Sequence, residues 1–243
     1  MFSNIYQRFY KAFFFQDRWL LYLEGLGNTI IIALIATLIG TVIGVSFAMV
    51  KYINKKSGRL KFLSKVINVY ITVIRGTPVV LQLMILYFIV FSGWDNGILI
   101  GSITFGLNSS AYVAEIARSG FESVDDGQME AGRSLGLSTW QTMYHIISPQ
   151  AIKNCLPPLF NEFITLVKET AIVGYVGIMD LGKIPGLIQS RTFDYLFPLL
   201  IAAVLYLVIV MILTKILHVI ENRFAKSDRY RYKGSNKGGA KNG

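Results

Sequence analysis

Five long apolar stretches, separated by shorter polar segments, dominate the pattern of hydrophobic and polar positions along the chain. A helix needs about 20 residues to cross the roughly 30 Å hydrocarbon core of a bilayer. The stretches predict membrane-spanning helices at about residues 26–50, 66–91, 96–118, 154–179 and 195–219. The pattern therefore indicates an all-α integral membrane protein with five transmembrane helices.

The N-terminal segment, residues 1–24, has a different pattern. Aromatic and aliphatic side chains recur in it at helical spacing, with the basic residues Arg8 and Lys11 between them. A helix with one apolar face and basic residues on the other lies in the plane of the membrane interface. We therefore expect an interfacial helix before the first transmembrane helix.

The longest polar segment, residues 119–153, carries the start and stop signals of a short helix. Asp125 or Asp126 can cap the start of this helix, and Gly136 can end it in the left-handed conformation. A second short helix is expected directly after it. Together they predict a compact loop rather than a flexible linker.

The signal for the second helix is a capping box. Ser138 is followed three residues later by Gln141, the spacing at which the two side chains cap each other's backbone amides. Pro149 is expected to help end this helix.

The composition agrees with a membrane protein. Hydrophobic residues make up 53% of the 243 residues and charged residues only 16%, whereas soluble domains carry about 25% charged residues. The net charge of +10 is concentrated in short segments after apolar stretches rather than spread over one surface. We therefore expect no nucleic-acid partner. The basic tail at 222–243 suits contact with anionic lipid, and we expect its residues 230–243 to be irregular.

The distribution of basic residues predicts the orientation. Segments 51–65, 115–153 and 215–243 together hold 17 Lys and Arg, whereas segments 1–24, 92–97 and 180–194 hold five. Basic residues are enriched in cytoplasmic segments. We expect a multi-pass protein of the plasma membrane with its N-terminus outside and its C-terminus in the cytoplasm.

Neither a metal site nor a nucleotide site is expected in this chain. One cysteine and two histidines do not supply a metal-ligand cluster. Residues 177–183 fit the first seven positions of a P-loop, but Ile184 stands where the motif requires Ser or Thr. Energy for any transport must therefore come from a partner or from an ion gradient.

Charged and polar residues inside two of the apolar stretches are candidates for a substrate path. Arg75 precedes a helix break at Thr77 and Pro78, because the residue before proline resists the helical conformation. The fourth stretch carries a polar stripe that contains Asn161, Glu162, Thr165, Lys168 and Glu169. Ionisable residues within the membrane normally face a helix bundle or an aqueous path. A stripe with both signs of charge suits a zwitterionic solute.

Two plainer interpretations of these charges stay open. Arg75 could extend to the membrane interface from a helix end, and Lys168 could pair with a carboxylate on a neighbouring helix.

In the first stretch, Gly40, Gly44 and Ala48 recur every four residues. This is a small-residue pattern that permits close helix packing.

The polar loop resembles a motif of a known family. Glu130-Ala131-Gly132, then Gly136 after three residues, then Ile146-Ile147-Ser148-Pro149 after nine more, resembles the EAA loop of the permease subunits of ABC importers. Gly132 stands for the usual second alanine and Ser148 for the usual leucine. The Glu–Gly–Pro spacing is unchanged.

Further motifs are similar to the polar amino acid branch of that family. They are Arg75-Gly76-Thr77-Pro78 with Gln82, residues 111–118, Gly127-Gln128 and Lys168-Glu169-Thr170. That branch often has Asp and Ser where Glu169 and Ala171 stand here. The resemblance extends over residues 25–221.

The resemblance implies the transmembrane permease subunit of a type I ABC importer for amino acids, not itself an enzyme. It implies a second permease subunit, two ATPase subunits that bind ATP and Mg²⁺, and an extracytoplasmic solute-binding protein; no cofactor is expected on this chain. The implied ATPase-coupling residues are Gly127, Glu130, Ala131, Gly132, Gly136 and Pro149. The implied path consists of Arg75, Thr77 and Gln82 with the polar stripe.

Two other functions are weaker alternatives. An ion-coupled secondary transporter would need no ATPase, but five passes without an evident inverted repeat are atypical of that class. A membrane-embedded enzyme would need a nucleophile with a nearby base, and His145, His218 and Cys155 each stand alone in the sequence.

Overall fold

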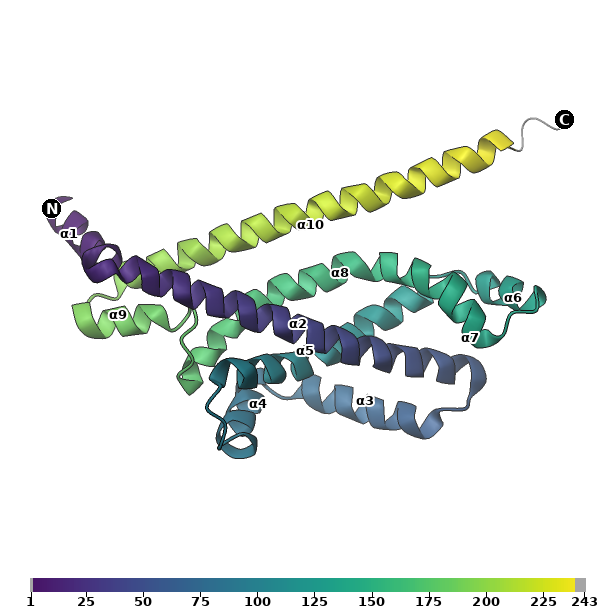
Figure 1. Ribbon diagram of the computed structural model, residues 1–243, viewed down its shortest axis with the longest axis horizontal. Coiled ribbons are helices and arrows are strands. Elements are labelled where there is room, and N and C mark those ends of the chain that lie inside the picture. The colour runs from purple at the N-terminus through teal and green to yellow at the C-terminus, as the bar shows by residue number, and fades with distance from the viewer. Residues whose placement is uncertain (1, 239–243) are drawn as a thin grey trace.

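The computed structural model describes the backbone of residues 2–238 and the side chains of residues 4–55 and 58–223. The regular secondary structure of the described chain is all helical, without a strand (Figure 1). Its α-helices are α1 (Phe2–Phe13), α2 (Arg18–Ser57), α3 (Lys61–Gly76), α4 (Val79–Ile85), α5 (Gly97–Glu122), α6 (Gly127–Ser134), α7 (Thr139–Thr142), α8 (Ser148–Glu169), α9 (Ile184–Thr192) and α10 (Leu196–Gly238). The expected all-α fold class is confirmed.

Three helices of the described chain, α2, α5 and α10, are long and apolar enough to cross a membrane. Helix α3 and the segment Val79–Val90, which holds α4 and a π-helical turn (Leu86–Val90), form a fourth candidate that is bent by 103°. Helix α8 contains Glu162, Lys168 and Glu169 and two internal prolines, so its composition is less apolar. The number of five passes stays a prediction.

The bend between α3 and α4 has a local cause. Thr77 has an extended ψ of 142°, because the proline ring disfavours the helical conformation of the residue before it. Pro78 itself is also extended, with a ψ of 130°. The expected break at this position is confirmed. The second apolar stretch is therefore two short helices rather than one helix over 66–91.

The centre of the fold is the contact between α2 and α5, which cross at close range. A Cβ atom added at Gly40 would lie 3.0 Å from the Ser109 side chain, and one at Gly44 would lie 2.7 Å from Val113. From the other side, a Cβ at Gly106 would lie 2.7 Å from Ile39. The expected small-residue contact on the first transmembrane helix is therefore present.

Several helix boundaries differ from those that the sequence predicts. Helix α2 begins at Arg18, inside the segment 1–24, and α8 begins at Ser148, inside the loop 119–153. Pro149 lies in the first turn of α8, where its missing amide hydrogen leaves no hydrogen bond unmade. The expectation that it ends the preceding helix is therefore wrong.

The C-terminal ends of the fourth and fifth apolar stretches also differ from those that the sequence predicts. The fourth finishes as a 3₁₀ turn (Thr170–Val176) after α8. Helix α10 continues to Gly238, well past the expected end near residue 219, so residues 230–238 are helical rather than irregular. Residues 239–243 of the expected tail lie outside the described residues.

Helix α1 packs on the start of α10. Phe9 contacts Phe197 edge to face at 6.1 Å, and the Arg8 guanidinium forms two hydrogen bonds of 2.8 and 2.9 Å with the Asp194 carboxylate. That pairing holds the pKa of Asp194 below its usual range. Tyr6 and Tyr10 on α1 are exposed. That α1 lies in the membrane interface stays a prediction.

Candidate functional site

Uncharged polar side chains lie along α5 in the middle of the fold. Ser102, Thr104, Asn108, Ser109 and Ser110 are all buried. The hydroxyl groups of Ser102 and Thr104 donate to carbonyl groups one turn earlier in the same helix, whereas the three consecutive residues from Asn108 contact other helices. Sequence reasoning missed these residues, although three adjacent polar residues within an apolar stretch are a usable signal.

The broken helix is joined to α5 by a chain of hydrogen bonds. Nε2 of Gln82 donates to Oγ1 of Thr77 at 2.7 Å and to the carbonyl of Ile74 at 2.8 Å. Nδ2 of Asn108 donates to Oε1 of Gln82 at 3.1 Å. Gln82 therefore binds a carbonyl group that the break leaves without a helical partner, which is how broken helices are tolerated at depth.

Arg75 also contacts α5. Its guanidinium carbon lies 5.2 Å from the centre of the Tyr112 ring, a cation–π distance. Tyr112 is one helical turn beyond Asn108, so Arg75 and Gln82 contact the same face of α5. The predicted path residues Arg75, Thr77 and Gln82 are thus brought together.

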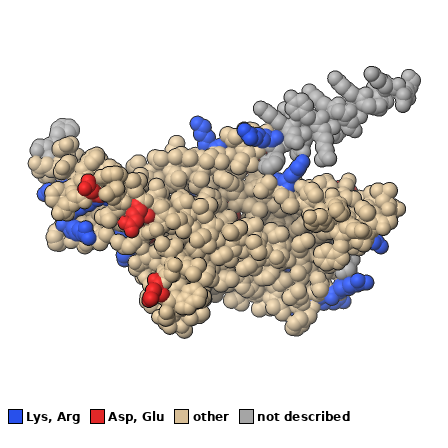
Figure 2. Space-filling view, in the orientation of Figure 1, with Lys and Arg blue, Asp and Glu red and all other residues tan. Residues whose placement is uncertain are grey.

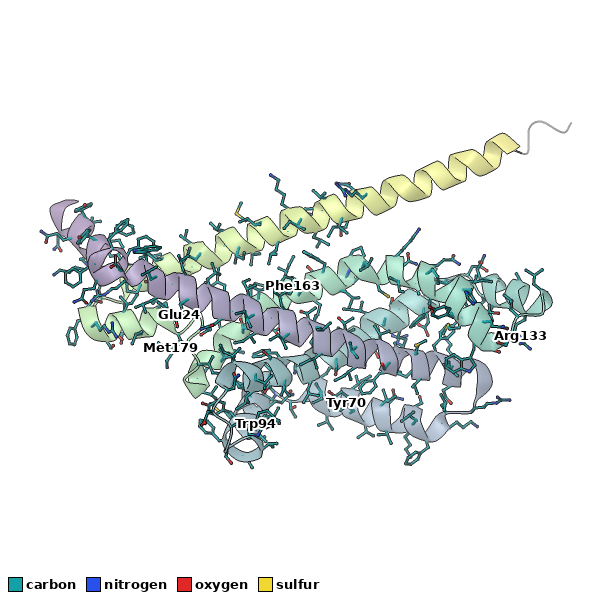
Figure 3. All side chains as sticks on the ribbon, viewed as in Figure 1. Glu24, Tyr70, Trp94, Arg133, Phe163 and Met179 are labelled. Atoms are coloured by element: carbon teal, nitrogen blue, oxygen red, sulfur yellow. The ribbon has the colours of Figure 1, made fainter. Side chains whose placement is uncertain are left out.

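Glu162 approaches α5 from α8. Oγ of Ser109 donates to Oε1 of Glu162 at 2.9 Å, and the carboxylate is half-buried. Two helices therefore contact two consecutive residues of α5, with Gln82 at Asn108 and Glu162 at Ser109. Tyr70 on α3 adds a third contact, since its hydroxyl lies 2.9 Å from both the Leu107 carbonyl and Oγ of Ser110 (Figure 3).

The rest of the predicted polar stripe on α8 does not share this position. Asn161 and Lys168 are exposed, and Thr165 donates its hydroxyl to the Asn161 carbonyl at 3.1 Å. Glu169 is half-buried at the end of α8. Only Glu162 of the stripe therefore forms a hydrogen bond with another helix in the described chain.

The loop between α5 and α8 is built as its capping signals predict. The Asp125 carboxylate accepts from the Gly127 amide at 2.7 Å, and Gly136 has a φ of +83°. The capping box of Ser138 and Gln141 is present, with bonds of 2.8 and 3.2 Å. Three cap geometries thus fix the short helices α6 and α7.

Helices α6 and α7 also pack closely on each other. A Cβ atom at Gly132 would lie 2.4 Å from the Thr142 side chain, so no side chain fits at this position. Glu130 and Ala131 are exposed on α6. Within the described part of the chain, the Glu130 carboxylate forms no hydrogen bond or ion pair, so it is open to a partner.

A ladder of ion pairs joins α2 to α5 just before this loop. Nζ of Lys51 lies 3.1 Å from the Glu115 carboxylate, and Nζ of Lys55 lies 2.8 Å from that of Glu122. Arg118 bonds both carboxylates, at 2.9 and 2.6 Å. A network shares the cost of ordering its side chains better than isolated surface pairs do. The end of α5 that leads into α6 is therefore held against α2.

At the opposite end of the molecule, hydrogen bonds of Asp180 and Leu181 tie the segment between α8 and α9 to α10 and α2, respectively. Its carboxylate is fully buried and accepts from the amides of Gly182 and Lys183 at 2.8 and 2.9 Å and from the Tyr206 hydroxyl of α10 at 3.3 Å. Thr29 of α2 accepts from the Leu181 amide at 3.1 Å. Burial raises the pKa of Asp180 to about 6.

This raised pKa predicts a pH dependence of folding stability. The carboxyl group favours the proton more in the folded than in the unfolded chain, so its contribution is complete below about pH 4 and is lost as pH rises through about 6. The contribution is at most about 3 kcal/mol, since one pKa unit is about 1.4 kcal/mol. We expect the midpoint of thermal unfolding to fall between pH 4 and 7 less in an Asp180→Asn variant than in the wild type. An equal fall in both would contradict the assignment.

The family of binding-protein-dependent transport system inner membrane components matches residues 40–226, more than half of the chain. The chain belongs to this family. Its members are the permease subunits of ABC importers, in which a separate subunit hydrolyses ATP.

Named relatives of this permease come from several bacteria. It is 39% identical over 218 residues to the putative glutamine transport system permease protein GlnP of Rickettsia bellii, covering 88% of this chain and 97% of the relative. It is 37% identical over 209 residues to the arginine transport system permease protein ArtQ of Bacillus subtilis, covering 85% and 93%.

Solved structures share the fold of this permease. A chain of an amino acid ABC transporter crystallised with histidines is 40% identical, with a TM-score of 0.76 over 84% of this chain and 94% of that one. A chain of the inward-facing MetNI methionine ABC transporter has a TM-score of 0.70 at 19% identity, over 84% and 98%. The second likeness concerns the fold alone.

Proposed function

We propose that this permease imports a polar amino acid, and that the solute passes the polar contacts at the middle of α5. The observation that carries the proposal is that Gln82 and Glu162, from two different helices, both hydrogen-bond to consecutive residues of α5, Asn108 and Ser109. Buried polar groups in a membrane bundle mark solute paths. Arg75 adds a positive charge beside them on Tyr112.

A polar amino acid suits this arrangement because it carries both charges. A carboxylate such as that of Glu162 can accept from an α-ammonium group, and the Arg75 guanidinium can donate to an α-carboxylate. Relatives named for glutamine and arginine transport support the same class. Along α8, the proposed path continues past the other polar residues of the stripe: Asn161, Thr165, Lys168 and Glu169.

Energy reaches this path through the loop of α6 and α7, which binds a cytoplasmic ATPase subunit. Gly127, Glu130, Ala131, Gly136 and Pro149 belong to this coupling surface, and the buried Gly132 sets the packing of α6 on α7 beneath it. The exposed side chains of Leu135, Trp140 and Tyr144 support it, since they are 80%, 61% and 72% exposed on a loop outside the apolar stretches. ATP and Mg²⁺ belong to the ATPase, and a second permease subunit and a solute-binding protein complete the importer.

Co-purification with the ATPase tests this function. The permease should retain the ATPase subunit, and the amino-acid-loaded binding protein should raise ATP hydrolysis by the reconstituted complex. An ion-coupled transporter would instead show uptake that needs an ion gradient and no ATPase. Uptake that needs an ion gradient and no ATPase would contradict the proposed function.

The proposed orientation places the α6–α7 loop in the cytoplasm and the turn between α4 and α5 outside. Ser134→Cys and Ser92→Cys variants, each in a Cys155→Ser background, test it, because both serines are exposed. In intact cells that express the permease alone, an impermeant thiol reagent should label position 92 and not position 134. The reverse labelling would contradict the orientation.

A further inference from the structure

An arginine without an acidic partner lies where α1, α2 and α9 meet, at one end of the molecule (Figure 1). Arg18 is the first residue of α2 and is only 5% exposed. Its Nη1 donates to the carbonyl of Lys11 on α1. Its guanidinium carbon lies 5.3 Å from the centre of the Phe15 ring, a cation–π distance. These contacts satisfy one nitrogen of the guanidinium group and cover one of its faces.

The opposite edge of this guanidinium group has no partner. Nε is buried and forms no hydrogen bond, and within the described part of the chain Nη2 forms none either. An arginine binds a phosphate or a carboxylate through two neighbouring N–H groups of this kind. A buried polar group without a hydrogen bond is costly, and a charged one more so. The free edge of Arg18 therefore points to an oxyanion ligand.

The charges around Arg18 also favour an anion. Arg191, at the end of α9, is close enough to repel Arg18 electrostatically. Asp17 is exposed and forms no ion pair within the described chain, and Asp194 is already bonded to Arg8. No side chain caps the N-terminus of α2, and a helix N-terminus attracts negative charge. Two guanidinium groups and a helix N-terminus thus lie together without a carboxylate between them.

The position of Arg18 along α2 indicates the headgroup layer of the membrane. The uncharged run of α2, residues 25–50, begins seven residues after Arg18, which is about 10 Å along a helix. Headgroups border the hydrocarbon near this depth. Phe15 and Trp19 beside it are exposed, and such aromatic side chains are typical of the membrane interface. On the face seen in Figure 2, charged side chains are sparse over the middle of the molecule and reappear at the end that holds α1 and α9.

An apolar groove beside this site suits an acyl chain. The groove has a volume of about 370 Å³ and lies between α1 and the start of α10, with Phe9, Phe13 and Phe197 among its lining residues. The Phe13 ring lies 5.9 Å from the ring of Tyr22, which is one turn after Arg18 on α2. The groove and the guanidinium group are therefore neighbours. A phosphate with a hydrocarbon chain matches both.

We propose that Arg18 and Arg191 bind the phosphate group of an anionic membrane phospholipid, with an acyl chain of the lipid in the groove between α1 and α10. The phosphate oxygens accept from the free edge of Arg18 and from the Arg191 guanidinium group. The lipid thereby joins the α1–α2 turn to α9, two segments that are far apart in the sequence. The site lies at the opposite end of the molecule from the α6–α7 loop (Figure 1).

Trp19, next to Arg18 in the sequence, provides a readout of binding. The full-length permease is purified in a neutral detergent with the substitutions Trp94→Phe and Trp140→Phe, so that Trp19 is the single indole. Short-chain phosphatidylglycerol is titrated while tryptophan fluorescence is followed, with phosphatidylcholine of the same chain length and inorganic phosphate as separate arms. We expect a saturable change with phosphatidylglycerol, and half-saturation at roughly tenfold higher concentration for phosphatidylcholine.

Variants of the two arginines test the assignment of the site. Arg191→Gln changes an exposed residue at the end of α9 and should weaken phosphatidylglycerol binding roughly tenfold. Arg18→Gln should weaken it at least as much. Arg223→Gln, an exposed arginine on α10, is the matched control and should bind as the wild type does.

Three results would overturn the proposal. The first is unchanged phosphatidylglycerol binding in Arg191→Gln, and the second is an equal response to inorganic phosphate, which indicates a soluble anion. The third is a fluorescence change that the solute-binding protein causes and phosphatidylglycerol does not, since it would assign the arginines to an acidic protein surface. The lipid titration needs no transport, so its failure leaves the proposed importer function untouched.

Discussion

Uptake should fall at least about tenfold when valine replaces Gly136, with the permease still inserted in the membrane. Gly136 has a φ of +83° at the junction of α6 and α7, and a side chain in that conformation costs about 1–2 kcal/mol, more for a β-branched residue. In the Gly136→Val variant, relief of this strain requires α6 to move relative to α7. Gly132, packed on Thr142 in the same loop, makes that movement costly.

The measurement is uptake together with retention of the ATPase subunit in a pull-down. Gly186→Val is the matched control, because Gly186 has no positive φ and no atom lies within 4 Å of an added Cβ. Glu130→Ala should also lose ATPase retention, since Glu130 is exposed and available to a partner. Normal uptake and normal ATPase retention in both loop variants would contradict the coupling role. Helices α6 and α7 would then be only a capped connection between α5 and α8.

Loss of the Glu162 carboxylate should produce the second large effect. A Glu162→Ala variant should lose most amino acid uptake, at least about tenfold, because a charge-assisted contact to a solute is worth roughly 1.5–3 kcal/mol. Assembly with the ATPase should be unchanged, since Glu162 lies against Ser109 of α5, away from the α6–α7 loop. Substrate-stimulated ATP hydrolysis and uptake are the two readouts.

Two further variants sharpen this test. Glu24→Ala is the matched control, since Glu24 is an exposed carboxylate on the first turns of α2 (Figure 3). Ser109→Ala removes the donor to Glu162 but leaves its charge, and should have a smaller effect than Glu162→Ala. Wild-type uptake with Glu162→Ala would show that the solute passes elsewhere.

Local chemistry explains which parts of the fold the sequence predicts. The bend at Thr77 and Pro78, the capping box at Ser138 and the left-handed Gly136 each depend on a few adjacent residues, so local rules suffice for them. The sequence predicts the close contact of α2 with α5 only in part, because the small residues Gly40 and Gly44 mark the α2 side of it.

The missed features depend on contacts between distant segments. In the sequence, Asn108 and Ser109 look like ordinary residues of an apolar helix. Only the packing of α4 and α8 on α5 gives them their hydrogen-bond partners, Gln82 and Glu162. The start of α8 was misplaced because proline stops a helix in its interior but is accepted in its first turn.

The ion-pair ladder of Lys51, Lys55, Glu115, Arg118 and Glu122 shows how the two proposed sites are connected. Helix α5 carries Asn108 and Ser109 at its middle and the ladder at its end, one short turn before α6. Packed, rigid elements of this kind carry coupling between distant sites. In the proposed importer, α5 would carry movement of the α6–α7 loop to the polar contacts.

The most direct test of the proposed function is uptake in liposomes that contain the permease, its ATPase partner and the solute-binding protein, with labelled glutamine and arginine offered separately. The proposed importer should accumulate at least one of them only when ATP is present, and Glu162→Ala and Gly136→Val should each reduce that accumulation at least about tenfold. Accumulation that needs no ATPase, or that follows an imposed ion gradient, would contradict it.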